Sequence, residues 1–62
     1  MSNEEKAIIY DQCVRESDIL QRVNSKIKSE NAGNIPPHLQ QTIDENDRKI
    51  NMLVERLKSL FN

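Results

Sequence analysis

Two long segments of the chain repeat their apolar residues at helical spacing, and a short stretch with glycine and proline separates them. Residues 2–32 contain neither glycine nor proline, and neither do residues 38–62. Apolar residues that recur three and four positions apart lie on one face of an α-helix. The pattern predicts an all-α protein: a single antiparallel helical hairpin over residues 1–62, with helices over about 3–31 and 37–61 and a link over about 32–36.

The second segment has the more regular repeat. Its seam, meaning the row of residues that faces a neighbouring helix, alternates steps of four and three with one polar member: Leu39, Ile43, Asn46, Ile50, Leu53, Leu57 and Leu60. Val54 and Phe61 each follow a seam residue and widen the apolar face. Such a repeat predicts a coiled coil, and the extra width predicts that more than two helices meet at this end.

The first segment has a seam of the same kind, interrupted by Glu16, with the apolar members Ile9, Cys13, Leu20, Val23 and Ile27. Ser2 and Glu5 fit a capping box at the start of this helix. Gly33 suits the left-handed conformation that often follows a helix end, and the two prolines after it cannot continue that helix. The segment therefore predicts a helix that ends shortly before Gly33.

A link this short makes the two helices antiparallel neighbours and brings their seams together. Folding about it places Leu20 opposite Asn46 and Glu16 opposite Ile50. The two polar seam residues, Glu16 and Asn46, then lie within about one turn of each other. We interpret them as residues that fix register and partner number. The alternative is that Glu16 reaches solvent from the seam edge and Asn46 is a tolerated interruption.

A chain of 62 residues, of which 35% are hydrophobic, has little material for a core of its own. One cysteine excludes an internal disulfide, and one cysteine with one histidine excludes a self-contained zinc site. We expect a protein partner, either a second copy or helices of another subunit, that completes a four-helix bundle. The expected core and interface residues are Ile9, Cys13, Leu20, Val23, Ile27, Leu39, Ile43, Ile50, Leu53, Val54, Leu57, Leu60 and Phe61.

Catalytic chemistry finds little support in the sequence. In the hairpin, Cys13 and His38 are separated by some 15 residues of helix, roughly 22 Å, whereas a nucleophile and its base must lie within hydrogen-bond reach. A hairpin has no cleft that would desolvate a carboxylate, and one glycine cannot build a phosphate-binding loop. We expect a non-enzymatic protein with no catalytic residues, cofactor, metal or small-molecule substrate.

The position of the basic residues along the chain, more than the net charge, suggests a second class of function. Nine basic and ten acidic residues leave a net charge of −1, which favours neither nucleic acid nor an anionic membrane. Arg15, Arg22, Lys26 and Lys28 nevertheless gather toward the end of the first helix and would form a basic stripe in a dimer. The length and the helix–turn–helix plan are similar to small plasmid-encoded RNA-binding hairpins that dimerise into four-helix bundles. This resemblance implies the alternative function, a dimeric RNA- or DNA-binding regulator.

The remaining evidence favours an intracellular protein that binds other proteins. No apolar run approaches the roughly 20 residues that span a bilayer, and a lone cysteine fits a reducing interior. We therefore expect a cytoplasmic or nuclear location without membrane contact. The segment Leu39 to Leu60 also looks like the heptad segments of eukaryotic scaffold subunits. The function favoured by the sequence is a protein–protein interaction module, a small coiled-coil subunit or adaptor that oligomerises or docks into a larger helical assembly.

Overall fold

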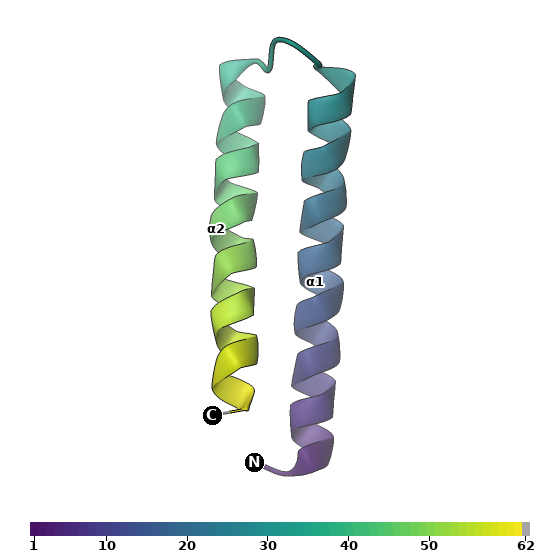
Figure 1. Ribbon diagram of the computed structural model, residues 1–62, viewed down its shortest axis with the longest axis vertical. Helices are drawn as coiled ribbons and strands as arrows, with labels where there is room; N and C mark the ends of the chain where they lie inside the picture. The colour runs from purple at the N-terminus through teal and green to yellow at the C-terminus, as the bar shows by residue number, and fades with distance from the viewer. Residues whose placement is uncertain (62) are drawn as a thin grey trace.

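The computed structural model describes residues 1–61 and consists of two antiparallel helices joined by a short link (Figure 1). Helix α1 spans Asn3–Glu30 and helix α2 spans Pro37–Leu60. The helices lie side by side and form a rod with principal dimensions of 46 × 14 × 13 Å, with both chain ends at the same end of the rod. The predicted all-α hairpin is confirmed, and each helix ends one residue before the predicted position.

Helix α1 begins where the sequence places its cap. Ser2 has an extended backbone, and its hydroxyl oxygen accepts a hydrogen bond from the Glu5 backbone N–H at 3.1 Å. This bond satisfies one of the four N–H groups that a helix start leaves without a partner. Glu4 and Glu5 lie in the first turn, where negative charge interacts favourably with the helix dipole.

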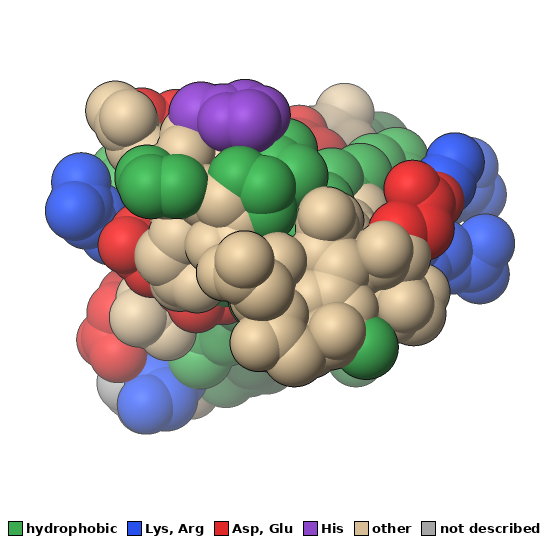
Figure 2. Space-filling model, turned by 90° about the horizontal axis from the view of Figure 1, so that it is seen from above, with side chains coloured by type: hydrophobic (Ala, Val, Ile, Leu, Met, Phe, Trp, Pro, Cys, Tyr) green, Lys and Arg blue, Asp and Glu red, His purple; other side chains and the backbone are tan. Residues whose placement is uncertain are grey.

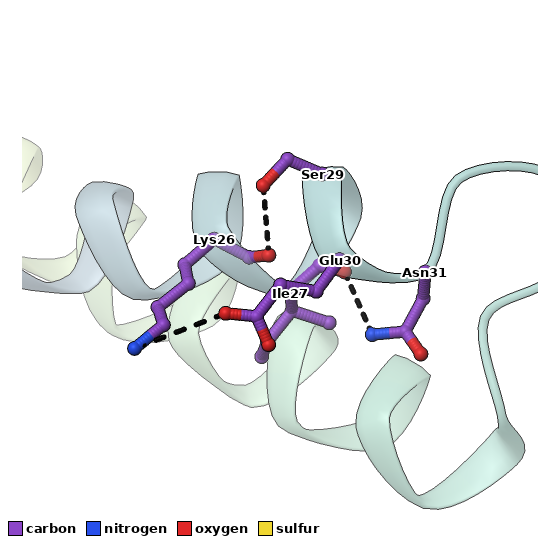
Figure 3. Close-up of polar contacts among 5 residues, drawn as sticks. All are labelled: Lys26, Ile27, Ser29, Glu30 and Asn31. Carbon is purple, nitrogen blue, oxygen red and sulfur yellow. Dashed lines mark hydrogen bonds and ion pairs between the residues drawn. The ribbon is translucent and has the colours of Figure 1, made fainter.

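Asn31 ends α1 and begins the link. Its backbone N–H donates to the Ile27 carbonyl oxygen at 3.1 Å. Its side-chain Nδ2 donates to the same oxygen at 2.9 Å (Figure 3). The chain then turns, and the Asn34 N–H donates to the Asn31 carbonyl at 3.1 Å. Gly33 lies in this turn with a φ of +90°, a conformation that residues with a Cβ adopt only at a cost. The left-handed conformation predicted for Gly33 is thus present.

Helix α2 begins at Pro37, and Pro36 occupies the capping position before it. The Pro36 carbonyl accepts hydrogen bonds from the N–H groups of Leu39 and Gln40, at 3.0 and 2.9 Å. Pro37 has no N–H to donate, but the first residue of a helix has no intrahelical acceptor in any case. The two prolines therefore end the link and open α2 without loss of a hydrogen bond.

The core is one narrow row of side chains along each helix. Among the described residues, the buried hydrophobic side chains are Cys13, Ile43 and Leu60. The other seam residues are half-buried, because only one neighbouring helix covers them: Ile9, Leu20, Ile27, Leu39, Ile50, Leu53 and Leu57. Val23, Val54 and Phe61, also expected in the core or interface, are exposed in the single chain.

Two details of the packing differ from the prediction. Asn24, rather than Leu20, lies opposite Asn46, so the helices are offset by about one turn from the predicted register. Helix α1 is also turned about its own axis: Asn24 is 5% exposed, whereas Val23, the predicted seam residue, is 40% exposed. The turned orientation gives the buried Asn46 a hydrogen-bond partner, which an apolar valine cannot supply.

Candidate protein-interaction surface

A chain of three polar side chains crosses the helix interface. Asn46 Nδ2 donates to Asn24 Oδ1 at 3.0 Å, and Asn24 Nδ2 donates to Asp47 Oδ1, also at 3.0 Å. Asn24 and Asn46 are buried, while Asp47 is exposed at the edge of the interface. Among the described residues, no buried side-chain nitrogen or oxygen lacks a hydrogen-bond partner. The network therefore holds two amides inside the interface without leaving either one unsatisfied.

The polar layer has different members from those that the sequence suggested. Asn46 lies in the interface, but Glu16 is exposed and the partner of Asn46 is Asn24. Sequence reasoning missed both Asn24 and Asp47. A signal for Asn24 was present, since it lies four residues after Leu20 and three before Ile27, a seam spacing as regular as that of Val23.

The network lies on one side of the hairpin, which we call the Asn24 side. Its members are Tyr10, Val14, Asn24, Asp47, Val54 and Phe61. Tyr10 is two heptads before Asn24, and Phe61 is two heptads after Asp47, so the four lie along one side of the two helices. The rings of Tyr10 and Phe61 meet edge to face with centroids 6.1 Å apart. They line an open groove of about 400 Å³ together with Asn3, Lys6 and Ala7. Contacts between the helices thus cover this side only in part, since Tyr10, Val14, Val54 and Phe61 remain 39–69% exposed.

The opposite side, which we call the Ile19 side, consists of Glu16, Ile19, Val23, Lys49, Met52 and Arg56. Val23 and Asn24 are consecutive, so their side chains leave α1 about 100° apart, on either flank of Leu20. Glu16, Leu20, Lys49, Met52 and Leu53 together line a shallow groove between the helices. Ile19 and Val23 follow Glu16 by three and seven residues and therefore share its face of α1.

The Ile19 side leaves large apolar side chains in solvent. Ile19 is 60% exposed and Met52 is 72% exposed, and Val23 adds to them on the same side. Glu16, Lys49 and Arg56 are exposed as well, and none of the three belongs to an ion pair among the described residues. This side thus combines uncovered apolar surface with charges that have no partner within the described part of the chain.

The basic residues expected in a nucleic-acid face do not form a continuous positive surface. Three of the four form exposed ion pairs with an acid four residues away: Arg15 with Asp11 at 3.0 Å, Arg22 with Asp18 at 2.9 Å and Lys26 with Glu30 at 3.8 Å (Figure 3). Viewed from the link end, Lys and Arg side chains lie on opposite flanks of the molecule rather than in one patch (Figure 2). The acids therefore divide the basic stripe that the sequence suggested.

The two residues considered for nucleophilic chemistry lie in different parts of the hairpin. Cys13 is a buried free thiol in the first half of α1. His38 is exposed in the first turn of α2, next to the link (Figure 2). Within residues 1–61, no group of three or more His, Cys, Asp or Glu side chains is placed to hold a metal ion.

No family model, curated protein or solved structure matches this chain. Within the described residues, neither helix is both long enough and apolar enough to cross a membrane. The function must therefore be inferred from the chain's own surface.

Proposed function

We propose that this chain is a non-enzymatic protein-interaction module: a helical hairpin that self-associates or docks into a larger helical assembly as a small subunit or adaptor. The observation that carries this proposal is the uncovered apolar surface of the Ile19 side. A contiguous apolar surface with a polar border is typical of a protein-binding site. Here Glu16 and Lys49 line the shallow groove beside Leu20, Met52 and Leu53, so charged groups accompany the apolar ones on this surface.

The balance between covered and uncovered apolar residues supports the same proposal. The hairpin fully buries only Cys13, Ile43 and Leu60 among its described hydrophobic residues. Complete burial of a large apolar side chain contributes about 1.5–3 kcal/mol, and ordering a residue costs a similar amount. A partner over the Ile19 side would bury Ile19 and Met52 and complete the burial of the half-covered seam leucines. Association is therefore the natural source of the stability that a two-helix core lacks.

Two valines of the same helix provide a matched test. Val23 on the Ile19 side is 40% exposed, and Val14 on the Asn24 side is 39% exposed. Thermal unfolding of the wild type, Val23→Gln and Val14→Gln should be followed by circular dichroism over a hundredfold range of protein concentration. An associating wild type has an unfolding midpoint that rises with concentration. We expect Val23→Gln to reduce this dependence and Val14→Gln to retain it.

The same experiment separates self-association from docking on another protein. A monomeric wild type with a weak helical signal at every concentration would agree with a module that folds on a different helical partner. A fully helical monomer that melts cooperatively, with a midpoint independent of concentration, would contradict the proposal, because such a chain needs no partner.

A further inference from the structure

We propose that the occupant of the Ile19 side is a second copy of this chain, related by a two-fold axis parallel to the helices. In this arrangement α1 of each copy lies against α2 of the other, and both links lie at the same end of a four-helix bundle. The inference rests on the proposed function and adds to it the identity of the partner and the orientation in which it binds.

The distribution of charge on the Ile19 side is the first support. The α1 edge carries Glu16, while the α2 edge carries Lys49 and Arg56, one heptad apart. Glu45, four residues before Lys49, is exposed and accepts a hydrogen bond from the neutral Gln41, so one acidic charge also lies on α2. Farther along α1, Lys26 and Glu30 neutralise each other at 3.8 Å. The middle of this side therefore has one acid, Glu16, on α1 and two basic residues, Lys49 and Arg56, on α2.

Two copies related by a two-fold axis can pack their Ile19 sides together in two ways, and the positions of the charged residues favour one of them. A two-fold axis parallel to the helices keeps every residue at its own height along the rod but exchanges left and right, so Glu16 of one copy lies between Lys49 and Arg56 of the other. The contact occurs twice, as in any interface made by identical surfaces. An axis perpendicular to the helices would instead place Glu16, near the middle of α1, against Glu16 of the second copy. Like charges in contact disfavour that arrangement.

The apolar residues and the size of the surface agree with the parallel axis. Ile19 of one copy would lie near Met52 of the other, because the groove shared by Glu16, Leu20, Met52 and Leu53 places these segments at similar heights. The flexible Met52 side chain, 72% exposed, can adapt to the branched side chains opposite it. A stable interface buries about 800 Å² per partner, which is about a sixth of the 4886 Å² accessible surface of the hairpin, a share that one of its long sides can supply.

A spin-label distance measurement tests the arrangement directly. Ala32 is exposed in the link, and the only native thiol, Cys13, is buried. Ala32→Cys should be labelled under native conditions, with the wild type as the control for labelling at Cys13. The distance between the two labels is then measured by double electron–electron resonance. With both links at one end we expect roughly 15–30 Å, since neighbouring helices in a bundle lie 8–10 Å apart.

Three other results of the distance measurement would contradict the inference, and each would exclude a different part of the account. A distance close to the 46 Å length of the rod would place the links at opposite ends and exclude the parallel axis, while self-association itself would stand. Absence of a dipolar signal from a weakly helical monomer would exclude the second copy but leave docking on another protein. A fully helical monomer would overturn both the inference and the proposed function.

Charge-reversal variants provide an independent test by sedimentation equilibrium. In the proposed dimer, Glu16→Lys and Lys49→Glu each place like charges in contact, so each should weaken dimerisation several-fold, roughly 3–10-fold. The double variant restores opposite charges and should return the dissociation constant toward that of the wild type. Glu55→Lys is the control, because Glu55 is exposed and its one ion-pair partner within residues 1–61 is Lys58 of its own helix. Unchanged dimerisation in both single variants would contradict the inference.

Discussion

The two sides of the hairpin are built from the same pair of helices but differ in how the helices contact each other. On the Asn24 side, hydrogen bonds join α1 to α2 and the rings of Tyr10 and Phe61 pack against each other. On the Ile19 side, the helices leave a shallow groove lined by Glu16 and Lys49. Apolar side chains are exposed on both sides: Ile19, Val23 and Met52 on this side, and Tyr10, Val14, Val54 and Phe61 on the Asn24 side. At the level of Asn46, helix α1 thus turns Asn24 toward α2 and leaves Val23 outside.

The difference follows from what each kind of residue requires. A buried amide needs a partner at a defined distance and angle, and leaving it unpaired costs about 1–3 kcal/mol. The short link holds α1 and α2 together, so the interface within the chain can supply that geometry reliably. An apolar side chain needs only to be removed from water, and any complementary helix can cover it. The hydrogen bonds that need a defined geometry are therefore made within the chain, and apolar contacts that need only the exclusion of water are left for a partner.

The largest effect is expected in the core that both sides share. Ile43 is 2% exposed, so Ile43→Asp would bury an unpaired carboxylate at a cost of several kcal/mol, comparable with breaking a buried charge pair, about 3–5 kcal/mol. We expect loss of most of the helical circular dichroism signal at 25 °C. Ile8→Asp is the matched control, because Ile8 is 59% exposed and should tolerate the charge. A helical signal unchanged in Ile43→Asp would show that α2 packs differently.

A smaller but more selective effect is expected on the Asn24 side. Asn24→Ala removes the acceptor of Asn46 and the donor to Asp47, so we expect a loss of about 1–3 kcal/mol in denaturant unfolding at fixed protein concentration. Replacing Asn24 and Asn46 together by leucine should restore stability, because no amide is then left unpaired. If Asn24→Ala were as stable as the wild type, the network would contribute nothing to the fold.

A substitution in the link should lower the stability of the whole hairpin and favour neither side. A Cβ added to Gly33 meets no atom within 4 Å, so the cost of Gly33→Ala arises only from its φ of +90°. That conformation costs a residue with a Cβ about 1–2 kcal/mol. We expect this loss in denaturant unfolding at fixed protein concentration, while the slope with which the unfolding midpoint rises with concentration stays as in the wild type. A stability equal to that of the wild type would mean that the link adopts another turn.

The smallest effect is expected on the outer surface, away from both sides. The Arg22–Asp18 ion pair has a distance of 2.9 Å, but both side chains are largely exposed. Exposed pairs of this spacing on a helix contribute about 0.3–0.5 kcal/mol, and salt screens them. Arg22→Ala should therefore lower stability by no more than this amount, and the difference should disappear at high salt. A loss above 1 kcal/mol would indicate an additional contact of Arg22.

The helices, their caps and the bend could be predicted because the signals for them are local. Ser2 caps the N–H of Glu5, three residues away, and the positive φ of Gly33 is needed within its own turn. The heptad repeat of α2 likewise reflects the face of a single helix. Each of these features depends on residues a few positions apart, which the sequence displays directly.

The rotation of α1 and the register of the helices could not be predicted in this way. Val23 and Asn24 both fit the spacing between Leu20 and Ile27, and the choice between them depends on Asn46, which is 22 residues away from Asn24 along the chain. The one-turn difference in register likewise arises from the path of the chain between the two helices. Periodicity identifies the face of each helix, but it does not specify how two faces fit together.

Sedimentation equilibrium of the wild type, combined with circular dichroism on the same samples, tests most directly whether the hairpin depends on a second copy. We predict a mass near twice the 7.2 kDa of the chain at high concentration, with the mass and the helical signal falling together on dilution. A fully helical species of 7.2 kDa at every concentration would contradict this, because the exposed side chains of the Ile19 side would then need no cover.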